Sequence, residues 1–205
     1  MAVTPPPPIS DTQDPSDDAR HDGVLMQRVA TGDTEAFREL VEKHQNRVIG
    51  TIAKMLGDGR DAEDLGQHVF LRVWNSAARY EPRAKFTTWL YTITRNLVFN
   101  EIRRRERSRS ESLDARIENT GDVFVDASTA RADEAVLREE LEAAIQSAMD
   151  ALSPTQRMAI VLRRYEDLSY DEIAVVMELS VSSVKSLLFR ARNELKESLA
   201  VYLDG

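Results

Sequence analysis

The sequence has no cysteine and few glycines, and each shortage excludes a class of structure. Without cysteine the chain can form no disulfide, no thiolate metal site and no cysteine nucleophile. Only 8 of 205 residues are glycine, which together with long patterns of helical period favours an all-α fold. No apolar run approaches the roughly 18 residues of a membrane span, and the N-terminus does not resemble a secretory signal. We therefore expect a cytoplasmic protein without membrane insertion.

Patterns typical of catalysis and metal binding are also scarce. The sequence contains no Gly-rich phosphate loop and no G-x-S-x-G motif. Of the three histidines, His44 and His68 fall in expected helices and His21 in the N-terminal segment. Asp64 and His68 lie one helical turn apart, but a third and fourth metal ligand are missing. We expect no enzyme activity, no metal and no cofactor.

The charge of the chain is unevenly distributed. The formal net charge is -8, yet residues 24–106 carry a net charge of +3 and residues 136–205 one of -4. Positive charge is therefore concentrated in one part of an acidic protein, where a polyanionic partner would bind.

Composition and periodicity divide the chain into four segments. Residues 1–22 contain a run of four prolines and several aspartates, and we expect them to be disordered. Residues 23–107 form a first helical domain, and residues 133–205 a second one. Between them, residues 108–132 lack periodicity and are too long for a connection inside a compact domain, which indicates a linker.

The stretch FTTWLYTITRNLVFNEIRRRER, residues 86–107, predicts an amphipathic helix in the first domain. Its polar side is rich in Thr, Asn and Arg, and an adjacent loop carries Tyr80, Arg83 and Lys85. Arginine neutralises phosphates, and planar or amide side chains hold unstacked bases, so this surface suits a single-stranded nucleic acid. A basic helix end that only interacts with the helix dipole is the alternative.

The second domain contains the spacing of a helix-turn-helix motif. Ser153 and Ser169 open capping boxes, and Ser180 is expected to cap the last helix. A turn over residues 178–180 separates a short helix from a longer one, although Glu178 stands where glycine is favoured. The longer helix exposes small and basic residues that fit a DNA major groove. An αα-hairpin with a solvated face is the alternative.

The motifs at residues 61–74 (DAEDLGQHVFLRVW), 86–105 and 168–192 together resemble the bacterial extracytoplasmic-function (ECF) sigma factors. These are small RNA polymerase sigma factors that contain only region two and region four. The resemblance covers about residues 24–106 and 134–203. It implies that the chain binds core RNA polymerase and directs it to promoter DNA, with no nucleotide or metal of its own.

The resemblance also implies three sets of contact residues. Region two is expected to bind the polymerase clamp through Asp61, Asp64, Gln67, Phe70 and Trp74. It is expected to capture the melted -10 element through Tyr80, Arg83, Lys85, Thr88, Thr92, Arg95, Asn96, Asn100, Arg103 and Arg104. Region four is expected to read the -35 element as duplex through Ser182, Ser183, Lys185, Ser186, Phe189 and Arg190.

Three residues depart from the family pattern. Gly66 and His68 replace residues that are usually an aliphatic and a Glu in the clamp-binding helix, and Glu178 replaces the turn glycine. Two other functions stay open: a stand-alone helix-turn-helix regulator that acts as a dimer on palindromic sites, and a helical protein-interaction bundle. Whether an anti-sigma factor binds the chain also stays open. We expect the acidic remainder to limit DNA binding by the free protein.

Overall fold

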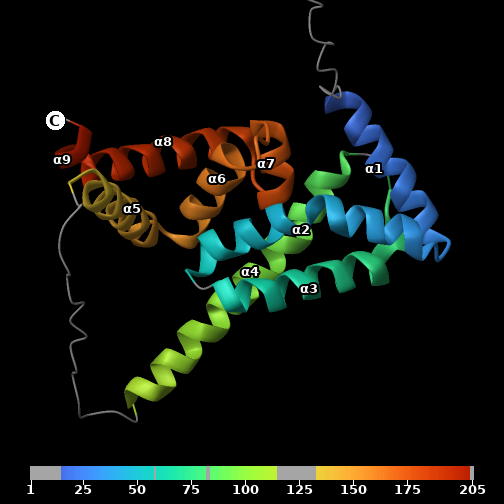
Figure 1. Ribbon diagram of the computed structural model, residues 1–205, viewed down its shortest axis with the longest axis horizontal. Helices are drawn as coiled ribbons and strands as arrows, with labels where there is room; N and C mark the ends of the chain where they lie inside the picture. The colour runs from blue at the N-terminus through green and yellow to red at the C-terminus, as the bar shows by residue number, and fades with distance from the viewer. Residues whose placement is uncertain (1–14, 58, 82–83, 115–132, 204–205) are drawn as a thin grey trace, which may run out of the picture.

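The computed structural model describes residues 15–57, 59–81, 84–114 and 133–203, and in these ranges it contains helices and no strand (Figure 1). The predicted all-α class is confirmed. No described helix is long and apolar enough to cross a membrane. The first domain contains α1 (Pro15–Ala30), α2 (Thr34–Leu56), α3 (Gly59–Ser76), the short 3-10 helix η1 (Ala77–Arg79) and α4 (Phe86–Asp114). The second contains α5 (Asp133–Ala151), α6 (Pro154–Arg164), α7 (Tyr170–Met177), α8 (Val181–Ser198) and α9 (Ala200–Leu203).

Helix α2 lies at the centre of the first domain and packs against α1, α3 and α4. The sequence predicts that Gly32 ends the preceding helix and that Asp33 caps the start of α2. The structure confirms this cap, because the Asp33 side chain accepts hydrogen bonds from the amides of Glu35 and Ala36. The apolar face of α2 is buried against those of its neighbours. Fully buried members of this core include Leu25 and Met26 of α1, Leu40, Val48 and Ile52 of α2, Val69 and Val73 of α3, and Leu90 and Val98 of α4.

The second domain owes its helix boundaries to serine caps. Ser153 and Ser169 both form complete capping boxes, and Ser180 accepts a hydrogen bond from the Ser183 amide. These caps confirm the predicted helix starts. Helices α7 and α8 pack on each other and on α6, around a core of Met158, Val161, Leu162, Ile173, Val176, Val184 and Leu188.

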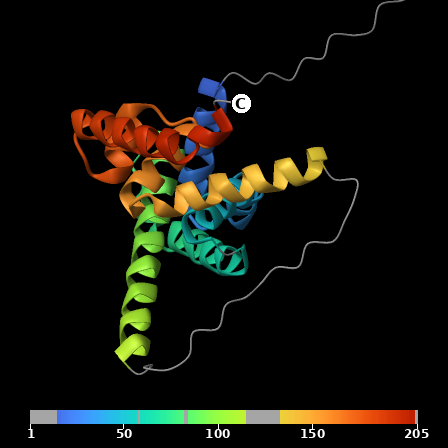
Figure 2. The same cartoon turned by 90° about the vertical axis from the view of Figure 1, so that its left-hand side faces the viewer.

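The two domains pack directly against each other. Helix α6 lies on α2, and α7 lies on α4 (Figure 1). The C-terminal half of α4 projects away from the other helices, as Figure 2 shows. One end of α4 is therefore covered by the second domain, whereas the other end is open.

Three boundaries differ from the sequence-based expectations. The segment 1–22 is not disordered throughout, because α1 begins at Pro15, and residues 1–14 lie outside the described residues. Helix α4 continues to Asp114, past the predicted start of the linker, and residues 115–132 are likewise outside the described part. The sequence also predicts Asp61 as the N-cap of α3, but this helix begins at Gly59, so Asp61 lies in its first turn.

Helix α1 begins earlier than expected because one of its side chains makes buried contacts with α2. Its residue Asp22 is buried, and its carboxylate is 2.5 Å from Lys43 Nζ and 2.9 Å from His44 Nε2, both on α2. Burial alone would raise the pKa of Asp22, but the hydrogen bonds from His44 and Lys43 outweigh it and hold this pKa below its usual value. A charge partner far along the sequence thus stabilises a helix that its own composition does not predict.

We expect Asp22→Asn to lower the free energy of unfolding by about 1–3 kcal/mol, since it leaves Lys43 without its buried partner. Because the folded-state pKa is depressed, the contribution of Asp22 is present above about pH 4 and is lost as the pH falls further. Urea unfolding at pH 7 measures the difference. Glu42→Gln, which removes an exposed ion pair with Arg38, is the control and should stay within about 0.5 kcal/mol of wild type.

Gly66 lies inside α3 where this helix crosses α2. A Cβ atom at Gly66 would be 2.9 Å from Cγ1 of Ile49, which a stiff β-branched side chain cannot easily vacate. An exposed helical glycine replaced by alanine would gain about 1 kcal/mol. We expect Gly66→Ala to give no such gain in stability in the wild-type chain. In a chain that already carries Ile49→Ala, the same substitution should give this gain, and thermal unfolding of the four proteins of this double-mutant cycle measures the difference. Additive effects of the two substitutions would contradict this explanation.

Candidate nucleic-acid and polymerase interfaces

Helix α8 has one buried and one exposed face. Val184, Leu188 and Ala191 are buried against α6 and α7. All of the residues that the sequence predicts to read duplex DNA lie on the exposed side: Ser182, Ser183, Lys185, Ser186, Phe189 and Arg190. The structure thus brings this predicted set together on one face.

The N-terminal half of the α8 surface is small and polar. Ser180 Oγ lies 3.0 Å from Ser182 Oγ and 2.8 Å from Ser183 Oγ, so the hydroxyls form a compact cluster at the helix start. Phe189 follows two turns later and is 65% exposed. A helix with short side chains at its start, together with Lys185 and a largely exposed aromatic ring, can enter a major groove and contact base edges.

Helix α4 presents a second polar face, of which the C-terminal half is open. Asn96, Asn100, Arg103 and Arg104 are exposed there. Arg103 donates to the Asn100 side chain at 3.2 Å, and Arg104 pairs with Glu101 at 2.7 Å. Hydrogen bonds from Arg104 and Arg105 lower the pKa of Glu101, so that this carboxylate stays charged and offsets part of the local positive charge.

The N-terminal half of the same face is largely covered by the second domain. Arg95 is 8% exposed, donates to the Met177 carbonyl at 3.3 Å and pairs with Glu178 at 2.5 Å. Thr88 is 1% exposed, and Lys85 pairs with Glu172 at 3.0 Å. The continuous open surface expected from the sequence is therefore interrupted.

The remaining predicted -10 residues lie beside this face. Tyr80 is partly buried, and its ring centroid is 5.2 Å from that of Trp89 in an edge-to-face contact. Burial, together with the charge of Asp22, raises the pKa of Tyr80. Thr92 is half-buried and donates to the Thr88 carbonyl at 2.9 Å. Arg83 lies outside the described residues.

The predicted polymerase-binding residues of α3 divide into two groups. Asp64 and Gln67 are exposed, and Asp61 is half-exposed and pairs with Arg105 of α4. In contrast, Phe70 is buried and Trp74 half-buried, with the Trp74 ring edge-to-face on Phe37. Phe70 therefore contributes mainly to the core.

A shallow apolar groove runs between α2 and α3 beside these residues. It has a volume of about 450 Å³ and is lined by Phe37, Val41, Ile49, Gly66, Gln67, Phe70 and Leu71, among others. Leu71 is 56% exposed, and sequence reasoning missed it because a single apolar residue outside the core stripe is common on protein surfaces. The absence of a side chain at Gly66 leaves the groove open.

Two family models match the chain, one in each domain. The model described as Sigma-70 region 2 matches residues 40–108, and that described as Sigma-70, region 4 matches residues 142–195. The ECF RNA polymerase sigma factor SigE of Mycolicibacterium smegmatis is 36% identical over 194 residues, which are 93% of this chain and 72% of that protein. This chain belongs to the ECF sigma factors. It is an alternative sigma factor that directs promoter-specific transcription by RNA polymerase.

Other relatives of this ECF sigma factor agree. The RNA polymerase sigma-H factor of Pseudomonas aeruginosa is 34% identical over 87% of this chain and 93% of its own length. The ECF RNA polymerase sigma-E factor of Escherichia coli K12 is 32% identical over 85% and 92%, respectively. The alternative of a stand-alone dimeric regulator finds no support in these matches.

Solved structures show the same fold. CnrH in complex with the cytosolic domain of CnrY superimposes with a TM-score of 0.66 at 24% identity, covering 88% of this chain and 98% of that one. The sigma factor RpoE in complex with the anti-sigma factor NepR, from Bartonella quintana, gives a TM-score of 0.62 at 25% identity, covering 80% and 97%. The two-domain architecture of the ECF sigma factor is thus shared.

The contact between the two domains contains functional candidates that the sequence did not reveal. Glu166, in the loop before α7, is buried, accepts from Arg47 Nε at 2.9 Å and Thr51 Oγ1 at 2.8 Å, and also accepts from the Tyr91 hydroxyl. Burial and the charge of Glu166 raise the pKa of Tyr91, so its hydroxyl stays protonated and donates. Only the unusual Glu178 in the turn signalled such a contact in the sequence.

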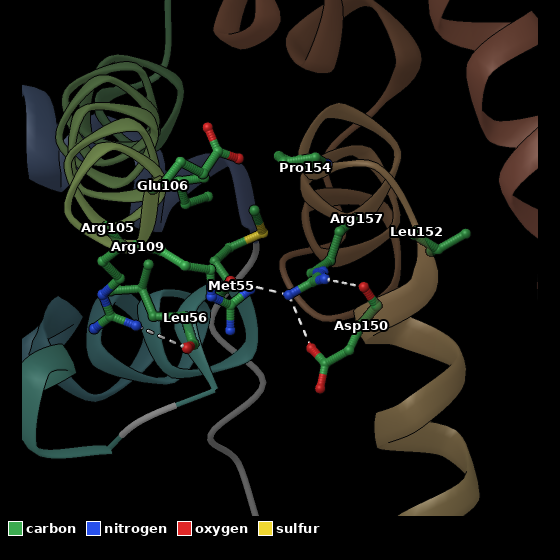
Figure 3. Close-up of a pocket in the computed structure, with 10 residues that line it drawn as sticks. Met55, Leu56, Arg105, Glu106, Arg109, Asp150, Leu152, Pro154 and Arg157 are labelled. Carbon is green, nitrogen blue, oxygen red and sulfur yellow. Dashed lines mark hydrogen bonds and ion pairs between the residues drawn. The ribbon is translucent and has the colours of Figure 1, made fainter. Parts of the chain in front are cut away.

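At the other end of the contact, Arg157 of α6 reaches across to α2. It donates to the Met55 carbonyl at 3.1 Å and pairs with Asp150 of its own domain at 2.9 Å (Figure 3). Beside it lies a cavity of about 430 Å³, which Arg105 and Leu56 line from the first domain and Leu152 and Pro154 from the second. The interface is thus polar at both ends and is incompletely filled here.

Proposed function

We propose that the two domains of this ECF sigma factor divide promoter recognition between them, with α8 reading the -35 element as duplex and α4 holding the melted -10 element. The observation that carries the -35 assignment is the exposure of the whole predicted contact set on one face of α8. Lys185 and Arg190 supply charge for phosphates or guanine edges, and Ser182, Ser183 and Ser186 allow close approach.

The -10 assignment rests on the polar face of α4. Asn96, Asn100, Arg103 and Arg104 offer amide and guanidinium groups along exposed turns of this helix, where a single strand can lie. Lys85, Thr88 and Arg95 extend the same face toward the helix start. Tyr80 and Trp89 place aromatic rings near this end, which suits stacking of unpaired bases.

The polymerase contact is proposed for α3 and the groove beside it. Asp64 and Gln67 are exposed, and Gln67 also lines the apolar groove together with Leu71. An occupant that carries both an apolar ridge and basic side chains fits this combination, as expected for the polymerase clamp. The factor would work in the cytoplasm as an initiation factor, without enzymatic activity of its own.

An anti-sigma factor is the second proposed partner. RpoE of Bartonella quintana forms a complex with the anti-sigma factor NepR, and this chain is 25% identical to that RpoE with most of both chains aligned. By this similarity, we infer that a regulatory protein of the same kind holds this sigma factor inactive.

Run-off transcription tests the proposed function directly. Purified core RNA polymerase is incubated with a pool of genomic promoter fragments, with and without this protein. Discrete start sites that depend on the protein are expected, and aligned upstream sequences give its -35 and -10 elements. Specific binding of the isolated protein to duplex DNA without such start sites would instead support a stand-alone regulator.

On a promoter mapped in this way, Lys185→Ala combined with Arg190→Ala should reduce run-off transcript by roughly thirty- to a thousand-fold, since each contact contributes about 1–2 kcal/mol to DNA binding. Lys196→Ala removes an exposed charge from the last turn of the same helix and should leave the transcript level within about two-fold of wild type. Equal losses in both variants would show that only bulk charge matters.

A further inference from the structure

The covered stripe of α4 faces helix α7 and the loop before it. Thr88, Tyr91 and Arg95 are spaced three and four residues apart and therefore share one side of α4, and Lys85 directly precedes the helix on the same side. The Tyr91 hydroxyl donates a hydrogen bond to Glu166. Arg95 forms an ion pair with Glu178, and Lys85 forms one with Glu172. The second domain thus lies along the part of the -10 face that is nearest to the start of α4.

The contact has opposite charges on its two sides. Second-domain carboxylates approach first-domain cations at three points: Glu166 to Arg47 at 2.9 Å, Glu172 to Lys85 at 3.0 Å, and Glu178 to Arg95 at 2.5 Å. The last two of these cations are among the residues proposed to bind the -10 strand. Carboxylates therefore occupy positions that DNA phosphates would take.

Two buried polar atoms in this stripe have no hydrogen-bond partner. They are Thr88 Oγ1 and Arg95 Nε, and both belong to the proposed -10 set. A buried donor without a partner is destabilising, so the closed arrangement leaves this stripe incompletely satisfied. A ligand richer in acceptors, such as a nucleic-acid strand, would satisfy both groups.

Glu178 contributes an unusual backbone conformation as well as a carboxylate to this contact. It adopts a left-handed conformation with φ of 56° at the end of α7, where glycine is favoured. Glycine there would relieve the backbone strain but would leave Arg95 without its carboxylate partner. The departure from the family pattern thus coincides with the interdomain ion pair.

We propose that the second domain is a built-in inhibitor of -10 binding, with Glu172 of α7 and Glu178 at its C-terminal cap standing in for the phosphates of the promoter strand. Domain closure and -10 capture are then mutually exclusive. The inference rests on the proposed role of α4, and it adds a competitor for that site within the same chain. Polymerase and promoter would have to displace α7 before α4 can hold the single strand.

The test measures domain closure by energy transfer between two dyes. Because the chain has no cysteine, Gln27→Cys on α1 and Asn193→Cys on α8 give two unique labelling positions, both exposed. The ligand is a single-stranded oligonucleotide that carries the -10 element mapped by run-off transcription. We expect efficient transfer in the free full-length chain and a fall in transfer on saturation with this oligonucleotide.

The matched variants change only the stand-in carboxylates. Glu172→Gln keeps the capping box, and Glu178→Gly suits the left-handed turn, so neither should unfold the domain. The double variant should show a larger open fraction and bind the oligonucleotide about five- to ten-fold more tightly, as for the loss of two partly exposed ion pairs. Asp171→Asn, which removes an exposed charge from the same helix, should behave as wild type.

The proposal is overturned if saturating oligonucleotide leaves the energy transfer of the labelled chain with its native carboxylates unchanged, a measurement that needs no carboxylate variant. It is also overturned if the double variant binds the strand no more tightly than Asp171→Asn. Both results can be told apart from a failure of the proposed function. In that case the wild-type protein would give no protein-dependent start sites in run-off transcription.

Discussion

A buried carboxylate determines how the two domains meet. Glu166 lies in the second domain, but its protein partners Arg47, Thr51 and Tyr91 all come from the first. A charged group removed from water must be paired, or it strongly destabilises the fold. Because all of these partners belong to the first domain, Glu166 can be buried only when the two domains are in contact. The interdomain positions of Glu172 and Glu178 follow from it, because α7 begins a few residues later, carries Glu172 and ends at the C-cap residue Glu178.

Because the two domains meet in this way, the two halves of α4 have different surroundings. Its N-terminal half packs under the second domain, where cations proposed for DNA meet carboxylates, and its C-terminal half carries exposed Asn and Arg side chains. The proposed DNA-reading face of α8 lies outside that contact and is exposed along its whole length. The closed arrangement therefore covers part of the -10 surface and leaves the -35 surface accessible. In this arrangement carboxylates of the acidic second domain face cations of the basic first domain.

Local signals made much of the fold predictable from sequence. The caps at Asp33, Ser153, Ser169 and Ser180 depend on residues within three positions of each other, and all four were correctly predicted. The exposed set on α8 follows from helical period alone. Prediction failed where the cause is distant in sequence: α1 depends on Asp22 contacting Lys43 and His44 of α2. The contacts of Tyr91 and Arg95 with the second domain likewise depend on residues more than 70 positions away, which periodicity cannot reveal.

Small-angle X-ray scattering of the free, unlabelled chain tests the central claim most directly, because it reports whether the domains are joined or separate. At low ionic strength, the account predicts scattering from one particle in which α6 and α7 lie on α2 and α4. At roughly 1 M salt, where the exposed pairs of Glu172 and Glu178 are screened, it predicts a larger radius of gyration. A profile of two separated domains at low salt would contradict the closed state, and with it the competition for α4.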